Sequence, residues 1–140
     1  MNRRIGWVMA LAMLIPLVAV ACGAGEQTAE GYENVEVAHV HEHWQQGEKA
    51  EIPFLILDVR TVEEYQDGHI AGATLIPVQE LAERIGEVPK DRQVYVHCHS
   101  GRRSARAAKL LAESGYSRIE NMLGGIVAWK DAGYPVTREE

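Results

Sequence analysis

Val94-Tyr95-Val96-His97, followed by Cys98-His99-Ser100-Gly101-Arg102-Arg103, is the stretch that organises this chain. Residues 94–97 are mostly β-branched or aromatic, a composition typical of a buried parallel strand. Residues 104–112 follow the loop and predict a helix, one face of which carries Ala105, Ala108, Leu111 and Ala112. A strand, a short loop and a helix in this order place Cys98 at the positive end of the helix dipole.

The charges around Cys98 indicate a loop that binds an anion. The 21 residues from Arg92 to Ala112 contain no Asp or Glu, yet they include Arg92, Arg102, Arg103, Arg106 and Lys109. Arginines in the first turn of a helix oppose its dipole, at a cost of a few tenths of a kcal/mol each. The pKa of a cysteine at a helix N-terminus can fall from about 8.5 to roughly 3.5–7.5. A buried structural cysteine is the alternative, but the basic window favours a reactive thiolate.

The first 21 residues predict a secretory signal peptide rather than part of the fold. Asn2-Arg3-Arg4 supplies the positive region, and residues 5–20 are apolar or small throughout. Ala19-Val20-Ala21 suits ordinary signal peptidase, whereas Cys22 followed by small residues resembles a bacterial lipobox, which usually has Leu where this chain has Ala19. We expect Cys22 to be acylated, because an unpaired cysteine at the cleavage point otherwise has no explanation. Two or more acyl chains give stable membrane attachment.

The mature chain is acidic and carries one thiol besides Cys22. Removal of residues 1–21 takes away two arginines and changes the formal net charge from −6 to −8, so we expect no nucleic-acid partner. An acylated Cys22 leaves Cys98 without a partner for a disulfide. An exported protein with a single free thiol is a candidate for using it chemically. The polar residues 22–33 predict a tether, and the remaining length suits one domain.

The rest of the chain alternates between predicted strands and helices. A short edge strand around Val35 and Val37 precedes strands at residues 54–58, 74–76, 94–97 and 119–122. Helices are predicted at residues 38–46, 62–65, 79–85 and 104–112, and after Gly124-Gly125. Thr61 and Glu64 form a capping-box pattern at the second of them. This alternation predicts a doubly wound α/β domain with a mostly parallel sheet, in which ligands bind at the carboxyl ends of the strands, where Cys98 falls.

Three histidines lie close together near the N-terminus of the predicted domain. On a helix His39 and His43 share one face and His41 does not, so a local metal site has only two ligands. A solvated helix face is the better interpretation, and we expect neither a metal nor another cofactor.

A set of short motifs runs in order through almost the whole mature chain: Asp58-Val59-Arg60, Glu64-Tyr65, Gly68-His69-Ile70-Ala71-Gly72-Ala73, Ile76-Pro77, the Cys98 loop, Gly115-Tyr116, Asn121, Gly124-Gly125-Ile126, Ala128-Trp129 and Gly133-Tyr134-Pro135. In these motifs the chain resembles the single-domain rhodaneses, sulfurtransferases of the thiosulfate type. The resemblance implies a rhodanese domain over residues 34–138 with a five-stranded parallel sheet flanked by helices. It also implies a ping-pong reaction in which the cysteine carries sulfane sulfur as a persulfide.

The resemblance assigns roles to individual residues. Cys98 is the nucleophile, and the backbone N–H groups of the following residues cradle its sulfur: His99, Ser100, Gly101, Arg102, Arg103 and Ser104. Arg103 closes the loop and Arg102 meets the thiosulfate dianion.

For two polar residues and three histidines, structural and functional roles are alternatives. Asp58 and Arg60 either brace the loop or form a strand-end ion pair. His69 and His97 are interpreted as structural, and His99 is a candidate for tuning the thiol.

Two other functional classes remain open. Cys98 to Ser104 comes close to the tyrosine-phosphatase signature, but four residues separate Cys98 from Arg103 where that signature has five. A phosphatase or arsenate reductase is therefore disfavoured. The second class is a non-catalytic or relay module that binds persulfide in the cell envelope.

Sequence leaves the donor and acceptor open. The expected partners are a small sulfur-containing anion such as thiosulfate, a thiol or cyanide acceptor, a possible protein acceptor, and a membrane through the lipid anchor at Cys22. The expected location is the cell envelope, with a soluble periplasmic form as the alternative.

Overall fold

A single mixed sheet forms the centre of the protein. The structure, a computed structural model, describes residues 25–138. Its sheet has six strands in the order β1-β2-β6-β5-β3-β4. Their bounds are β1 Glu26–Gln27, β2 Glu33–Val35, β3 Phe54–Asp58, β4 Thr74–Leu75, β5 Gln93–His97 and β6 Ile119–Met122. Every neighbouring pair is parallel except β1 and β2, which are antiparallel.

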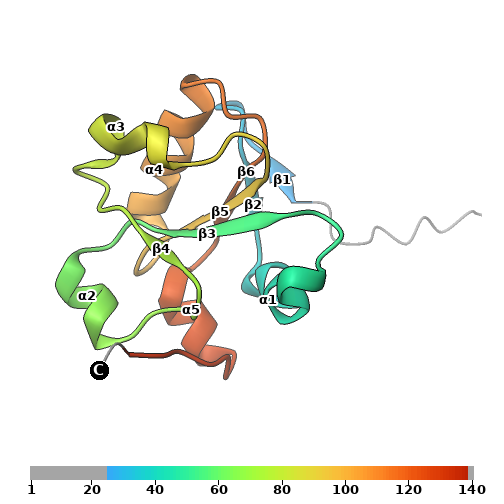
Figure 1. Cartoon of the computed structure of the whole chain (residues 1–140), viewed down its shortest axis with the longest axis vertical. Coiled ribbons are helices and arrows are strands. Elements are labelled where there is room, and N and C mark those ends of the chain that lie inside the picture. The colour runs from blue at the N-terminus through green and yellow to red at the C-terminus, as the bar shows by residue number, and fades with distance from the viewer. Residues whose placement is uncertain (1–24, 139–140) are drawn as a thin grey trace, which may run out of the picture.

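Helices cover both faces of this sheet, as Figure 1 shows. Their bounds are α1 Val37–Gln46, η1 Gly47–Lys49, α2 Val62–Asp67, α3 Leu81–Arg84, η2 Ile85–Glu87, α4 Arg102–Glu113 and α5 Gly125–Asp131. On one face α3 and α4 pack against alternate strand residues such as Val94 and Val96. On the other face α1 and α5 pack against the strand residues that alternate with these, such as Tyr95. The period of two in a strand therefore gives two apolar cores, and the prediction of a doubly wound α/β fold is confirmed.

The sheet has one strand more than the five that the sequence predicts. Glu26 and Gln27, which the sequence assigns to the tether, pair with Asn34 and Glu33 of β2. As a result β2 lies inside the sheet rather than at its edge. Val37 belongs to α1 rather than to this strand. A two-residue polar strand has no apolar alternation, so its pairing depends on a neighbour that sequence inspection does not reveal.

The helix after Cys98 begins earlier and faces differently than predicted. It begins at Arg102, directly after Gly101, whose φ of 103° lies in the left-handed region. Its buried residues are Ser104, Ala107, Ala108 and Leu111, whereas Ala105 and Ala112 are only half-buried. Because alanine occurs on several faces of this helix, the apolar pattern alone leaves its rotation open.

The predicted signal peptide and Cys22 lie outside the described residues. Within residues 25–138, none of the helices has the length and apolar character needed to cross a membrane.

Candidate active site at the Cys98 loop

Cys98 lies at the centre of the carboxyl edge of the sheet. It follows β5, which pairs with β3 on one side and β6 on the other. The thiol is free and the residue is 1% exposed. Three loop residues separate it from the start of α4. The parallel strand therefore fixes the position of the cysteine, and the first turn of the helix adjoins its sulfur, as the sequence predicts.

Neutral hydrogen-bond donors surround the Cys98 sulfur. The N–H group of Gly101 donates to Sγ at 3.1 Å. Burial alone raises the pKa of the Cys98 thiol, but the hydroxyl and N–H of Ser104 and the N–H groups of Gly101 and Ser100 outweigh it. The pKa is therefore below its ordinary value. Of the six N–H groups that the sequence assigns to this cradle, those of Ser100, Gly101 and Ser104 make these contacts.

The start of α5 holds the carbonyl groups of the same loop. The N–H of Ile126 donates to the Cys98 oxygen at 2.9 Å, and the N–H of Val127 donates to the His99 oxygen at 3.2 Å. These are first-turn donors that have no partner within their own helix. A Cβ on Gly125 would lie 2.5 Å from the Cys98 oxygen, so this approach requires glycine. Because α5 binds the carbonyl groups of Cys98 and His99, the N–H groups of the loop are left to face the Cys98 sulfur. Sequence reasoning missed this contact, although Gly124-Gly125 stood among the matching motifs.

Arg103 connects the loop to α2. Its two terminal nitrogens donate to the two carboxylate oxygens of Glu64 at 2.6 and 2.7 Å. Glu64 also completes the predicted capping box with Thr61, which the structure confirms. The hydrogen bonds from Arg103 lower the pKa of Glu64 to about 2. Glu64 raises the pKa of Arg103, and the Cys98 sulfur adds to this shift. The sequence identifies Glu64 only as a cap, because a sequence separation of 39 hides its pairing with Arg103.

Asp58 and Arg60 form a buried ion pair beside the loop. Arg60 donates to the Asp58 carboxylate from Nε at 2.9 Å and from Nη2 at 2.6 Å. Its remaining donors contact the carbonyls of Glu64 at 3.0 Å and Gly68 at 2.9 Å. This pair therefore fixes α2 against the end of β3. Its contacts with the Cys98 loop are indirect and pass through Glu64 and Arg103 on one side and through His97 on the other.

Two of the histidines near the site have structural contacts. The Nδ1 of His97 lies 3.2 Å from the Cys98 oxygen and its Nε2 lies 3.5 Å from Asp58. Burial lowers the pKa of His97 more than the nearby Asp58 carboxylate raises it, so the ring is neutral at neutral pH. His69 is buried and stacks on Tyr65 at 3.7 Å between ring centroids. His99 is exposed at the mouth of the loop.

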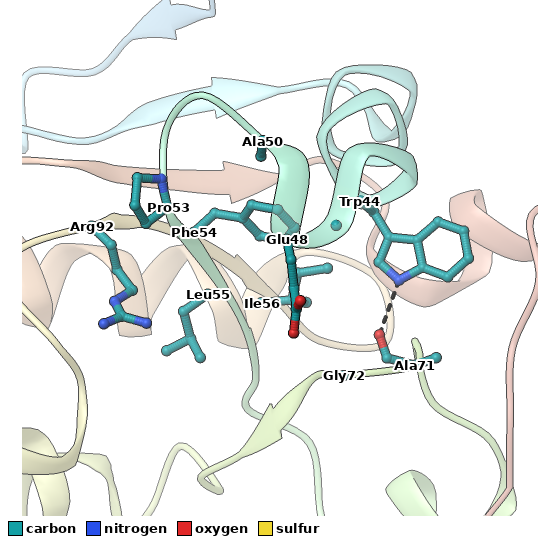
Figure 2. A pocket seen from close by; sticks show the side chains of 11 residues that line it. Trp44, Glu48, Ala50, Pro53, Phe54, Leu55, Ile56, Ala71, Gly72 and Arg92 are labelled. Carbon is teal, nitrogen blue, oxygen red and sulfur yellow. Dashed lines mark hydrogen bonds between the residues drawn. The ribbon is translucent and has the colours of Figure 1, made fainter.

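The cations of the basic window lie in two separate places in the structure. Arg102 is exposed beside the loop. Arg92 instead pairs with Asp91 before β5 and lines a separate cavity of about 610 Å³. Figure 2 shows this cavity between the start of β3 and the segment that holds Trp44 and Glu48. Arg92 therefore does not belong to the site, because five strand residues separate it from Cys98.

The histidines of α1 have separate partners. His39 lies 3.1 Å from Glu120, His43 contacts the Tyr95 hydroxyl, and His41 stacks on Tyr134 at 3.6 Å. Among residues 25–138, no three His, Cys, Asp or Glu side chains are arranged to hold a metal ion.

Comparisons with known proteins agree with this geometry. Residues 38–132 match the model of the rhodanese-like domain family. A sulfurtransferase of Allochromatium vinosum is 41% identical over 86 residues, which are 61% of this chain and 80% of the relative. The thiosulfate sulfurtransferase PspE of Escherichia coli is 42% identical over 81 residues, which are 56% of this chain and 74% of the relative.

Solved structures give the same result. The crystal structure of a rhodanese-related protein from Thermoplasma volcanium superposes with a TM-score of 0.67 at 33% identity, over 76% of this chain and 98% of that one. The chain belongs to the rhodanese-like domain family.

Proposed function

We propose that this protein is a thiosulfate-type sulfurtransferase that carries sulfane sulfur on Cys98. The observation that supports this most is a free, buried thiol of lowered pKa within a ring of N–H and O–H donors. The names of the two similar sulfurtransferases point in the same direction.

The reaction consists of two displacements at sulfur. The Cys98 thiolate attacks the outer sulfur of thiosulfate, the S–S bond of the donor breaks, and sulfite leaves with the electron pair. The outer sulfur of the resulting persulfide anion is then attacked by cyanide or a thiolate, and Cys98 leaves as the thiolate. No external oxidant or reductant is needed. The donors of Ser100, Gly101 and Ser104 stabilise the anion before and after the first step, as preorganised dipoles.

Two arginines serve this reaction differently. Arg102 is exposed at the rim and attracts the dianion to a chain of net negative charge. Arg103 is fixed by Glu64 and holds the loop in its closed shape. Arg102→Ala should therefore raise the KM for thiosulfate, whereas Arg103→Ala should also lower kcat.

Mass spectrometry after incubation with thiosulfate tests the proposal directly. The peptide that contains Cys98 should gain the mass of one sulfur atom, and cyanide should remove it. Cys98→Ser should abolish both events and leave the fold intact. A wild type that takes up no sulfur, or that hydrolyses aryl phosphates or reduces arsenate instead, would contradict the assignment.

We also propose that the protein is exported and attached to a membrane face through acylated Cys22. The apolar run of residues 5–20, which ends in small residues and Cys22, supports this location. The wild type should fractionate with membranes, and Cys22→Ala should either stay unprocessed or appear in the soluble fraction. An unmodified Cys22 at the N-terminus of a soluble protein would show cleavage by ordinary signal peptidase instead.

A further inference from the structure

The arginines of this protein differ sharply in whether they have a carboxylate partner. Arg84 pairs with Glu80 and Glu87, and the other paired arginines are Arg60, Arg92, Arg103 and Arg138. Within residues 25–138, no carboxylate oxygen lies within 4.0 Å of a charged nitrogen of Arg102, Arg106 or Lys109. Arg118, Lys49, Lys90 and Lys130 also have no carboxylate partner among the described residues, but they lie on different segments. Three unpaired cations on one helix of a chain with 20 acidic residues are a feature that needs a cause.

These three cations form one line along α4. Their spacing of four and then three residues places them on the same face of a helix. All three are exposed, whereas Ser104, Ala107, Ala108 and Leu111 face the core. We call Arg102, Arg106 and Lys109 the basic stripe. The stripe begins at the rim of the Cys98 loop and runs away from it along the outside of the helix.

A small donor does not account for the whole stripe. Each residue of a helix adds about 1.5 Å, so Lys109 lies about 10 Å along the axis from Arg102. A thiosulfate ion at the Cys98 sulfur is too small to reach beyond the first of these cations. Basic residues in the first turn of a helix also oppose its dipole, so Arg102 is unfavourable for the helix itself. A larger anionic surface that approaches the thiol would contact all three.

We infer that the basic stripe docks the acidic surface of a protein whose own thiol exchanges sulfur with Cys98. This inference rests on the proposed sulfurtransferase function and names the class of macromolecular acceptor. Charge complementarity guides such a partner to the loop, because opposite potentials raise the rate of encounter and fix its orientation. The acceptor thiolate attacks the outer sulfur of the Cys98 persulfide, the S–S bond breaks, and Cys98 leaves as the thiolate.

Two peptides that each contain one cysteine provide the probe, one with glutamates around the cysteine and the other with glutamines. Sulfur transfer from thiosulfate to each peptide is measured for the wild type and for Arg106→Gln/Lys109→Gln. Arg118→Gln/Lys49→Gln is the matched control, because it removes the same two charge types from exposed residues outside the stripe. Transfer to cyanide is measured for every variant, and binding is followed separately with a glutamate peptide in which serine replaces cysteine.

At low ionic strength the wild type should prefer the glutamate peptide about tenfold in kcat/KM, with a steep salt dependence. The Arg106→Gln/Lys109→Gln variant should lose most of this preference and bind the serine peptide several times more weakly, whereas its cyanide activity stays within about twofold because salt screens distant charges. The control should behave as the wild type.

Each alternative outcome has a distinct meaning. An equal peptide preference in the stripe variant and the wild type would overturn the inference. If the wild type transfers no sulfur to cyanide but binds the serine peptide through the stripe, the proposed function is overturned and the assignment of the stripe as a docking surface still holds. Binding to phosphatidylglycerol vesicles through the stripe, without binding of the acidic peptide, would assign the stripe to a membrane and also overturn the inference.

Discussion

A carboxylate and a thiol of lowered pKa lie at neighbouring strand ends of this protein and are held in different ways. The Asp58 carboxylate ends β3, and Cys98 follows β5 directly beside it in the sheet. Asp58 accepts hydrogen bonds from the backbone N–H, Nε and Nη2 of Arg60, so a buried cation neutralises it completely. The Cys98 sulfur receives mainly neutral donors instead. Arg103 also contacts the sulfur, but it gives its two shortest bonds to Glu64.

This difference is the one that the proposed function requires between a structural carboxylate and a reactive thiol. A carboxylate in a full ion pair has its lone pairs occupied and contributes through rigidity. A thiolate stabilised mainly by dipoles has a lowered pKa but keeps electron density for attack, because Arg103, the cation that contacts the sulfur, gives its two shortest bonds to Glu64. Glu64 maintains this state by occupying Arg103. The four predictions below disturb one member of the comparison at a time.

The largest effect is expected for Asp58→Asn. The substitution leaves the buried Arg60 guanidinium without its countercharge, which should cost about 3–5 kcal/mol in the free energy of unfolding. Urea denaturation measures this loss. Asp67→Asn is the matched control, because Asp67 and Arg138 form an exposed pair and such pairs contribute about 0–1 kcal/mol. Equal stabilities of the two variants would show that the Asp58–Arg60 pair does not brace α2.

The second prediction concerns the carbonyl side of the Cys98 loop. Gly125→Ala places a Cβ 2.5 Å from the Cys98 oxygen and 2.6 Å from the His99 oxygen, at a φ of 58°. We expect a fall in kcat/KM for sulfur transfer of about 100-fold, as misplacing a reacting group by roughly 1 Å commonly causes. Gly133→Ala is the control, because its φ is 79° and no atom lies within 4 Å of the added Cβ. That variant has the backbone strain without the clash, and its activity should stay near that of the wild type.

The parts of this site that sequence analysis predicts are those set by local sequence. The strand before Cys98, the acid-free loop and the Thr61–Glu64 capping box each depend on a few adjacent residues, and the structure contains all three. The contact between Arg103 and Glu64 is different, because the two residues come from separate crossover units. Their pairing follows from the strand order, which local patterns do not contain.

Arg102 and Arg103 illustrate the same limit at neighbouring positions. They are adjacent and chemically identical, yet Arg102 points to solvent and Arg103 forms the bridge to Glu64. Successive residues of a helix differ by about 100° in direction, so a shift of one residue in the helix face exchanges their roles. The sixth strand escaped prediction for a related reason, since Glu26–Gln27 has no pattern of its own and only its pairing with β2 defines it.

The third prediction tests the neutral donors directly. Ser104→Ala removes the hydroxyl, which lowers the pKa of the Cys98 thiol more than any other donor and also lies 3.1 Å from the Gly101 oxygen, to which it donates. We expect that pKa to rise, so alkylation by iodoacetamide at neutral pH should slow severalfold and recover at higher pH. Ser100→Ala is the control, because Ser100 acts through its N–H and its side chain is exposed. An unchanged alkylation profile in Ser104→Ala would mean that the backbone N–H groups alone stabilise the thiolate.

The smallest effect is expected for the stability of Glu64→Gln. The pKa of Glu64 is lowered to about 2, so its ionised form stabilises the folded state above the unfolded pKa of about 4.3, and this contribution is lost as the pH falls towards 2. The pair is about 30% exposed, so we expect the variant to lose no more than about 1 kcal/mol at neutral pH. The difference from the wild type should vanish near pH 2. Glu113→Gln, which removes an exposed carboxylate without an ion pair among the described residues, should show no such pH dependence.

Glu64→Gln also has a chemical consequence that bears on the two anions. An amide accepts only weakly from Arg103, so the guanidinium becomes available to the Cys98 sulfur, which it already approaches. The thiol pKa should then fall further, while each thiolate becomes less nucleophilic, because nucleophilicity declines with pKa. Stopped-flow alkylation across pH separates the two quantities: the titration midpoint should move down and the plateau rate should decrease. A higher plateau rate would contradict this prediction and show that Arg103 promotes attack. The expected lower plateau rate would mean that a thiolate paired with Arg103 becomes unreactive, as the Asp58 carboxylate is when paired with Arg60.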